Sequence, residues 1–346
     1  MRIDVVRALV LAGLLSIGSE GVAQHERQSG AASPPQPAQA QQGVVADQLQ
    51  QLDERPQGRV VMLNEEAKRR LEQLEREAHQ NPSDAMAQAR YGRALIAVGQ
   101  IQEGLASFAR ARAIAPDDPE VLLLYAKGLW KAGRTDEAID LALRVSRSAL
   151  ASNKLASEAF FVAGEAITRR GDPERGEAYL VQAIERDPDN PGPLLNLGLR
   201  RLSQRDMDDA LNLINRAAKS DPDNVRVQST LAQTLEIAGM EELALEAWTR
   251  VADLVPGDPN VRVKLGSAYL VRGEHETAAK HFEKGISLTP GDANLHLLYG
   301  EALLYLGRLD EAAEQAEKAK QLGADVSFLM QEIAQARWEA SLPAQD

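Results

Sequence analysis

Histidines and paired acidic side chains are the residues of this chain that could perform acid–base or metal chemistry, and their spacing supports neither. The five histidines are His25, His79, His275, His281 and His296. A zinc site built on one helix needs two histidines four residues apart, and no pair here has that spacing. His275 and His281 are six residues apart, which is not one helical face. We therefore expect packing or solvated histidines and no metal site.

Other residue types that carry chemistry have structural explanations. Adjacent carboxylates such as Asp208-Asp209 stand at expected helix starts, where they complement the helix dipole. The glycines fall at expected helix ends and crossings, so none indicates a phosphate-binding loop. No Gly-x-Ser-x-Gly nucleophile motif is present, and the chain has no cysteine. We expect a protein that is not an enzyme and that uses no cofactor.

The composition favours a helical protein. Of the 346 residues, 44% are hydrophobic but only 4% are aromatic, which suits Ala- and Leu-rich helices better than β-sandwiches or propellers. The formal net charge is −12, and Lys and Arg are scattered among acidic residues. A nucleic-acid partner is therefore not expected.

Prolines recur along the chain at a fixed interval. The same interval occurs in two runs: Pro82 and Pro116, then Pro188, Pro222, Pro256 and Pro290. Between prolines lie two apolar helical patterns, with small residues where two helices would cross. In six of seven intervals a glycine ends the first helix, since glycine adopts the left-handed cap without strain: Gly99, Gly133, Gly171, Gly239, Gly273 and Gly307. Each interval therefore predicts a helical hairpin.

Spacing, small residues and terminal proline together resemble the tetratricopeptide repeat, a helix-turn-helix module. The resemblance covers roughly residues 85 to 324. It implies an all-α fold, a right-handed α-solenoid of about seven 34-residue repeats with capping helices at both ends. The expected repeats are 85–118, 119–156, 157–190, 191–224, 225–258, 259–292 and 293–324.

Two units depart from the pattern. The unit 119–156 lacks the terminal proline and carries four additional residues around Ser148 to Lys154, which predict an extended helix or a longer turn. In the unit 191–224, Arg201 occupies a normally apolar position and Arg205 replaces the glycine. We expect local distortion in that unit.

Both ends of the array need a cap, because a terminal repeat would otherwise expose its apolar side. Residues 60–84 resemble the lone second helix of a half repeat. Residues 325–346 predict a final helix that reaches about Ala340 and a short tail. Its expected apolar face consists of Phe328, Leu329, Ile333, Ala336 and Trp338.

Residues 1–23 resemble a bacterial export signal. Arg2 and Arg7 precede an uncharged apolar stretch, and small residues end at Ala23. The stretch has about half of the ~20 residues that a membrane helix needs. Cleavage near Ala23 would give a periplasmic or secreted protein without a direct membrane span. Residues 24–59, rich in Gln, Pro and Ala, predict a disordered leader.

The first helices of a curved array line its concave face. The residues expected there are mostly apolar: Leu123, Lys127, Trp130, Phe161, Leu195, Leu199, Leu202, Val263, Leu270, Leu297 and Leu304. They predict a groove that binds an amphipathic helix or an extended peptide of a protein partner. Alternatively, these bulky residues pack between repeats, or the chain's own residues 24–62 fill the groove. A carboxylate clamp like that of chaperone-binding relatives is not assembled, because Lys127 and Arg93 are accompanied by Glu165 and Glu301.

The resemblance implies a non-catalytic interaction scaffold or adaptor of the bacterial cell envelope. Exported proteins similar to this family also serve as chaperones or accessory subunits in exopolysaccharide export, outer-membrane or pilus biogenesis, or c-type cytochrome maturation. A noncatalytic regulator of an envelope enzyme is a third alternative. The sequence selects neither among these roles nor an oligomeric state.

Overall fold

The computed structural model describes residues 65–342. These residues form sixteen α-helices and contain no strand, which confirms the all-α helical repeat fold. The expected signal 1–23, the leader 24–59, its proposed place in the groove and residues 343–346 all lie outside the described residues. None of the helices between residues 65 and 342 combines the length and the apolar character that a membrane span requires.

One helix precedes seven helical hairpins, and another follows them. The first is α3 (Glu65–Gln80) and the last is α18 (Ser327–Ser341). The hairpins are α4 (Ala85–Ala97) with α5 (Ile101–Ile114), α6 (Pro119–Lys131) with α7 (Thr135–Ser146), α8 (Asn153–Arg169) with α9 (Pro173–Arg186), α10 (Pro191–Ser203) with α11 (Met207–Ser220), α12 (Val225–Ile237) with α13 (Glu241–Leu254), α14 (Pro259–Val271) with α15 (His275–Leu288), and α16 (Ala293–Tyr305) with α17 (Leu309–Gln321).

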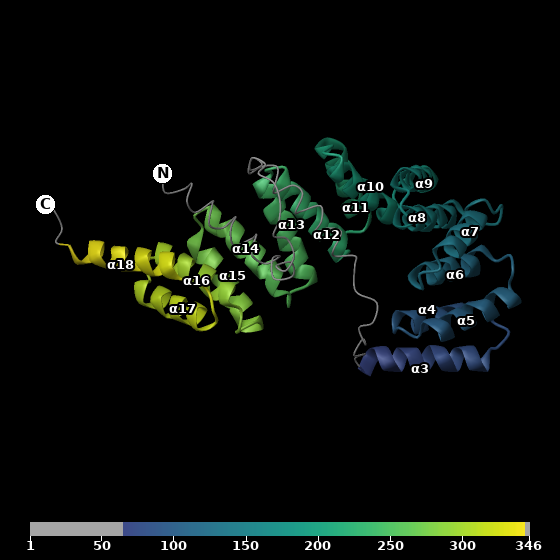
Figure 1. Ribbon diagram of the computed structural model, residues 1–346, viewed down its shortest axis with the longest axis horizontal. Coiled ribbons are helices and arrows are strands. Elements are labelled where there is room, and N and C mark those ends of the chain that lie inside the picture. The colour runs from purple at the N-terminus through teal and green to yellow at the C-terminus, as the bar shows by residue number, and fades with distance from the viewer. Residues whose placement is uncertain (1–64, 343–346) are drawn as a thin grey trace, which may run out of the picture. The chain divides into compact units, whose positions relative to one another are not determined.

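The helices belong to two compact units, α3 to α11 and α12 to α18, divided between Pro222 and Asp223. In the N-terminal unit, α4 packs against α6 and α6 packs against α8, while each second helix also packs against the first helix that follows it (Figure 1). In the C-terminal unit, α14 contacts α16 and α16 contacts α18. The first helices α4, α6 and α8 therefore form a layer in one unit, and α14, α16 and α18 form a layer in the other. The candidate binding residues lie on helices of these layers and on α10.

A polar side chain starts every first helix. The Asp84 carboxylate, for example, accepts hydrogen bonds from the backbone N–H groups of Met86 and Ala87 at 2.8 and 3.1 Å. Such caps satisfy donors that have no partner inside the helix. The residues that serve in this way are Asp84, Asp118, Ser152, Asn190, Asn224, Asp258 and Asp292.

Small residues let the two helices of a hairpin approach closely. In the hairpin of α4 and α5, a Cβ atom added to Gly104 would lie 2.8 Å from the backbone oxygen of Gly92. In the hairpin of α8 and α9, a Cβ atom on Gly176 would lie 2.8 Å from the backbone oxygen of Gly164. A larger side chain at either crossing would force the backbones apart.

Several first helices bury a polar residue at their fourth position and satisfy it with hydrogen bonds. The Gln88 side chain donates to the Ala78 carbonyl at 2.8 Å and accepts from Arg110 Nε at 3.1 Å. The ring nitrogens of His296 lie 2.8 Å from Gln315 Oε1 and 3.1 Å from the Pro290 carbonyl oxygen. His296 is therefore a structural residue that ties α16 to its surroundings.

The four additional residues of the second hairpin produce both predicted features. A turn runs from Arg147 to Ser152, and α8 extends over 17 residues. Ser152 then caps α8 by accepting a hydrogen bond from the Leu155 N–H at 3.2 Å.

The prediction of a local distortion at Arg205 is wrong. Arg205 adopts φ of 65°, close to the 71° of Gly239 and the 73° of Gly307 at the equivalent turns. The Asp206 N–H bonds to the Arg201 carbonyl at 2.9 Å, as the Met240 N–H bonds to the Leu235 carbonyl at 2.9 Å. The turn is therefore kept, and the arginine is strained instead.

The buried face of α18 is narrower than predicted. Leu329 and Ile333 are buried against α16 and α17, as expected for a capping helix. Phe328 and Trp338, however, are 48% and 61% exposed, so their assignment to the same face is wrong. The helical rotation of about 100° per residue directs Trp338 to the side opposite Leu329.

Substitution of Arg205 by glycine should stabilise the N-terminal unit. Among the described residues the Arg205 side chain makes no hydrogen bond or ion pair, so little is lost, while the left-handed strain is relieved. After the entropic cost of glycine, the expected gain is about 0.5–1 kcal/mol. A urea titration followed by circular dichroism should show a higher midpoint for Arg205→Gly. The matched change Gly239→Ala should lower the midpoint, and an unchanged Arg205→Gly midpoint would contradict the strain.

Candidate functional site

Two aromatic side chains lie half-buried on consecutive first helices of the N-terminal unit. Trp130 is on α6 and Phe161 is on α8, and both retain surface open to solvent. On α10, Leu199 and Leu202 are half-buried in the same way. Large apolar side chains with accessible surface on neighbouring helices are typical of a surface that binds another protein segment.

A cation covers the indole ring of Trp130. The guanidinium carbon of Arg169, an exposed residue at the end of α8, lies 4.8 Å from the ring centroid. The indole Nε1 is buried and has no hydrogen-bond acceptor among the described residues. Trp130 thus combines a cation–π contact with a buried donor that has no acceptor among the described residues.

The neighbouring cation Lys127 is paired within the protein. Its ammonium group forms an ion pair with Glu158, which links α6 to α8, and both side chains keep roughly a third of their surface exposed. Exposed pairs of this kind contribute little to stability and exchange partners readily. Lys127 can therefore contact a partner only in competition with Glu158.

The Phe161 ring rests against the start of α10. A Cβ atom added to Gly192 would lie 3.0 Å from the nearest ring atom. Phe161 therefore fills space between consecutive hairpins while part of its ring stays accessible. Phe161 therefore fits both alternatives: it packs between repeats, and it keeps surface that a partner could contact.

Four of the expected groove residues are part of the core. Leu123 and Leu195 are 2% and 3% exposed, and Val263 and Leu270 are 5% and 2% exposed. Side chains so deeply buried give a partner almost no surface. In the C-terminal unit Leu297 and Leu304 are half-buried and pack against the cluster that contains Leu329 and Ile333 of α18.

Sequence reasoning missed Arg169 and Glu158, although a signal was present. With the repeat length and four additional residues, Thr168 corresponds to Trp130 one hairpin later, and Arg169 follows directly. Glu158 is the sixth residue of the same helix, 31 residues after Lys127. The expected repeat 157–190 already contains this shift, so both charges could have been placed beside α6 from the same register.

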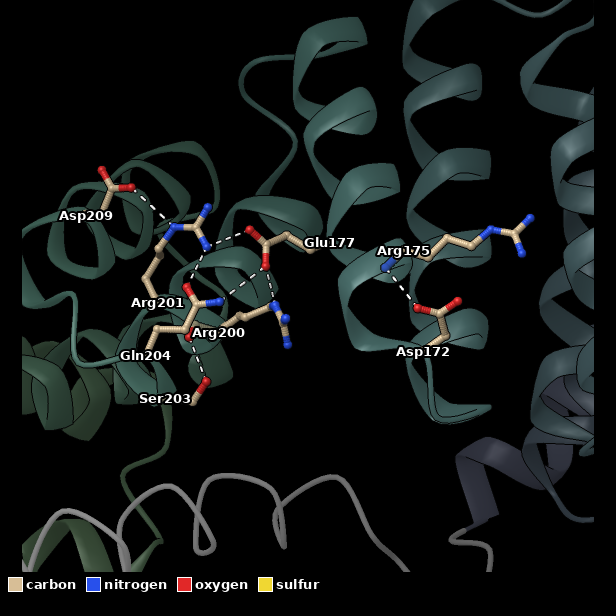
Figure 2. Close-up of polar contacts among 8 residues, drawn as sticks. All are labelled: Asp172, Arg175, Glu177, Arg200, Arg201, Ser203, Gln204 and Asp209. Carbon is tan, nitrogen blue, oxygen red and sulfur yellow. Dashed lines mark hydrogen bonds and ion pairs between the residues drawn. The ribbon is translucent and has the colours of Figure 1, made fainter.

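A charged network occupies the position where Arg201 replaces an apolar residue. The carboxylate of Glu177 on α9 accepts hydrogen bonds from Arg200 Nε and from Arg201, the latter at 2.7 Å (Figure 2). Arg201 also reaches Asp209 Oδ2 at 3.3 Å and Gln204 Oε1 at 2.7 Å. The network joins α9, α10 and α11 and replaces apolar packing by ion pairs.

The electrostatics of this network argue against acid–base catalysis. Burial raises the pKa of Glu177, but hydrogen bonds and charges from Arg200 and Arg201 outweigh burial, so the pKa lies below its usual value. Hydrogen bonds from Arg201 to Glu177 raise the pKa of the arginine. Groups held in their charged forms stabilise a structure rather than exchange protons near neutral pH.

The described histidines stack on tyrosines or bond to the backbone. His281 stacks on Tyr269 with centroids 5.4 Å apart, and His275 stacks on Tyr305 at 4.7 Å. Burial lowers the pKa of both histidines. Within residues 65–342, no group of three or more potential ligands is arranged to hold a metal ion.

Glu301 on α16 is a half-buried carboxylate of the first-helix layer. Burial raises its pKa from 4.5 to about 7. The pKa of Tyr305 is also raised, by burial and then by the charge of Glu301. Near neutral pH the carboxylate is therefore partly protonated, so this part of the C-terminal unit carries less negative charge than the sequence indicates.

Stacked helical hairpins that present half-exposed rings on one layer define a helical repeat protein of the protein-interaction type. Two tetratricopeptide repeat models match the sequence, one at residues 95–152 and 168–234 and the other at residues 64–119 and 263–326. The chain belongs to the tetratricopeptide repeat family. Members of this family bind protein partners and are generally non-catalytic.

Solved structures share the fold. The C-terminal part of a repeat-containing protein from Cytophaga hutchinsonii is 15% identical, with a TM-score of 0.52 over 70% of this chain and 98% of that chain. Cut9, in the Cut9–Hcn1 hetero-tetramer of APC/C, is 18% identical, with a TM-score of 0.50 over 67% of this chain and 46% of that structure's chain. A crystal structure of MamA is 25% identical and covers 46% of this chain and 93% of its own, with a TM-score of 0.41. No curated protein sequence matches the chain.

Substitution of Glu301 by glutamine should make the C-terminal unit less sensitive to pH. Because the folded pKa is raised to about 7, the stabilising contribution of protonated Glu301 is complete below about pH 4.5 and is lost as the pH rises through about 7. Calorimetric melting at pH 8 should show Glu301→Gln more stable than the unsubstituted chain by roughly 1 kcal/mol after solvent screening. At pH 4.5 the two should melt alike.

Glu311→Gln is the contrasting control. A hydrogen bond from Arg308 lowers the pKa of Glu311, so that substitution should not stabilise the protein at pH 8. Equal melting of Glu301→Gln and the unsubstituted chain at pH 8 would show that Glu301 is solvated.

Proposed function

We propose that the chain is a non-catalytic scaffold that binds a helix or extended segment of a partner protein on the first-helix layer of its N-terminal unit. The observation that carries this proposal is the pair of half-buried rings, Trp130 and Phe161, on consecutive first helices. Tryptophan is enriched among the residues that dominate binding energy, because its ring buries a large apolar area and brings a hydrogen-bond donor.

The contacts around the rings define the chemistry of a suitable segment. An apolar side chain would pack on the accessible part of either ring. A carboxylate or backbone carbonyl would replace Trp130 as the partner of Arg169, or Glu158 as the partner of Lys127. Segments with apolar residues flanked by acidic residues therefore fit this surface better than basic ones.

We further propose that this scaffold acts in the bacterial cell envelope. The support is the sequence of residues 1–23, with its basic start, apolar stretch and small residues before Gln24. A chaperone or accessory subunit of an envelope assembly machine remains the second candidate, and a regulator of an envelope enzyme the third. A scaffold retains its partner in stoichiometric amounts, whereas a chaperone releases the unfolded chain, so the stability of the complex discriminates between them.

Photocrosslinking from the ring positions tests the binding surface. A photoreactive phenylalanine analogue at Trp130 or at Phe161 should capture the same partner in native cells. The control position is Val181, which is 38% exposed on the second helix α9. Capture from Val181 with none from either ring position would refute the assignment.

Removal of the indole tests how much Trp130 contributes to the free energy of partner binding. Trp130→Ala should weaken the captured partner's binding at least tenfold in a titration with purified proteins, in line with the ~2 kcal/mol typical of an anchoring tryptophan. Leu150→Ala is the matched control, since Leu150 is 72% exposed in the turn before α8. Equal losses of affinity in Trp130→Ala and Leu150→Ala would show that Trp130 is not an anchor of the interface.

Processing of the N-terminus tests the location. The chain recovered from the periplasm of a bacterial host should begin at Gln24, as determined by mass spectrometry. Substitution of the apolar stretch by charge, as in Leu11→Arg with Leu14→Arg, should keep the chain uncleaved in the cytoplasm. Cytoplasmic accumulation of the unsubstituted chain with Met1 retained would contradict export.

A further inference from the structure

The first and last described helices, α3 and α18, differ in how many charged residues they expose. The exposed residues of α3 are largely charged: Lys68, Arg69, Arg70, Glu72, Glu75 and Arg76. On α18, the side away from Leu329 and Ile333 carries mainly uncharged residues, with the exposed Arg337 and Glu339 beside them: Met330, Gln331, Ala334, Gln335, Trp338 and Ser341, followed by Leu342 after the helix. Among the residues 65–342 nothing covers this side, and Met330, Trp338 and Leu342 are 40%, 61% and 50% exposed. A helix that only seals the array should be polar on the outside, as α3 is.

The helix α18 takes the place of the first helix of another hairpin. It begins at Ser327, one repeat length after the Ala293 that begins α16, and it packs against α16 as first helices do. In this register Ala334 corresponds to Gly300, the small residue at the hairpin crossing. The face of α18 that a second helix would cover is therefore centred on Ala334 and open.

We propose that this face binds the same face of a second copy, with the two α18 helices antiparallel and crossing at Ala334 across a two-fold axis. The crossing follows the rule of the chain's own hairpins, in which antiparallel helices cross at small residues, as Gly92 does over Gly104. Two-fold pairs of this kind use the same patch on both copies and close without further growth.

The arrangement of side chains about Ala334 is self-complementary. Met330 stands four residues before Ala334 and Trp338 four residues after it, so the antiparallel crossing places each Met330 against the Trp338 of the other copy. Sulfur–aromatic contacts of this type are favourable. Arg337, three residues after Ala334, lies beside Met330 on this side of the helix, and its charge is paired with Asp310 at 2.6 Å.

The second terminal helix is a poor occupant for the same face. Arg70 of α3 lies one repeat length before Gly104 and so occupies the small-residue position of a second helix. A bulky, charged side chain at that position prevents the close crossing that Ala334 permits. Head-to-tail association through α3 and α18 is therefore disfavoured relative to the two-fold pair.

The size of the face predicts a reversible dimer. Met330, Trp338 and Leu342 together expose roughly 300 Å² of surface, at the low end of the functional patches found on monomers. An interface of about this area on each copy is smaller than a standard interface and fits only a weak pair. Association should therefore depend on concentration.

Sedimentation velocity of the purified chain over a hundredfold concentration range tests the pair. The unsubstituted chain should shift from monomer to dimer. Ala334→Arg and Trp338→Ala, both at exposed positions, should raise the dimer dissociation constant at least tenfold while the helical circular dichroism stays unchanged. Leu243→Ala, at a residue 50% exposed on α13, is the matched control and should leave the constant unchanged. A chain that stays monomeric throughout, or variants that dimerise as the unsubstituted chain does, would overturn the proposal.

A single introduced thiol tests the register, because the chain has no cysteine of its own. Ala334→Cys should form a disulfide between copies under mild oxidation, since the crossing brings the two positions within the ~7 Å that a disulfide tolerates. Ala97→Cys, at an exposed position of α4, should stay reduced. A disulfide between Ala334→Cys and Arg70→Cys chains, without one between two Ala334→Cys chains, would establish head-to-tail association and refute the two-fold pair.

Discussion

The close crossing of two helix backbones within each hairpin is the constraint on which the rest of this structure depends. At Gly92 and Gly104, and again at Gly164 and Gly176, the backbones come so near that one added methyl group would collide with a carbonyl oxygen. A single hairpin has only two helices, so it buries only part of their apolar surface by itself. The remainder is covered by the next hairpin, which is why the first helices contact one another and form the layer that carries the candidate site.

The regular spacing of prolines and glycines made the fold predictable, but it did not make the solvent exposure of each side chain predictable. The regular proline interval and the turn glycines were sufficient to expect paired helices, and φ values of 71–98° at six of those glycines agree with their predicted role. Position in the repeat, however, does not determine how much of a side chain a neighbour covers. Leu123 and Trp130 lie on the same helix, but Leu123 is buried while Trp130 keeps accessible surface.

Two arginines stand where the repeat usually has a glycine or an apolar residue, and the repeat pattern alone did not predict their structural effects. Arg205 keeps the turn of a glycine because the hydrogen bonds on either side fix the backbone, and the cost appears as strain rather than as a changed path. Arg201 replaces an apolar contact by a network with Glu177 and Asp209, and its value depends on partners from two other helices. The exposed side of α18 was missed because Phe328 and Trp338 were assigned to one face with Leu329, whereas the helical rotation separates them.

The two proposed surfaces lie on different units and share no residue. The rings of Trp130 and Phe161 are on α6 and α8, whereas the exposed face of α18 around Ala334 belongs to the C-terminal unit. A pair of copies joined through α18 would thus carry two separate sites for partner segments. When both engage one assembly, the second contact is intramolecular, so avidity exceeds the affinity of either site wherever the geometry allows both to bind. Weak single contacts at exposed rings and ion pairs then suffice for stable association, which is the physical advantage of a scaffold that is both repeated along its chain and paired at its end.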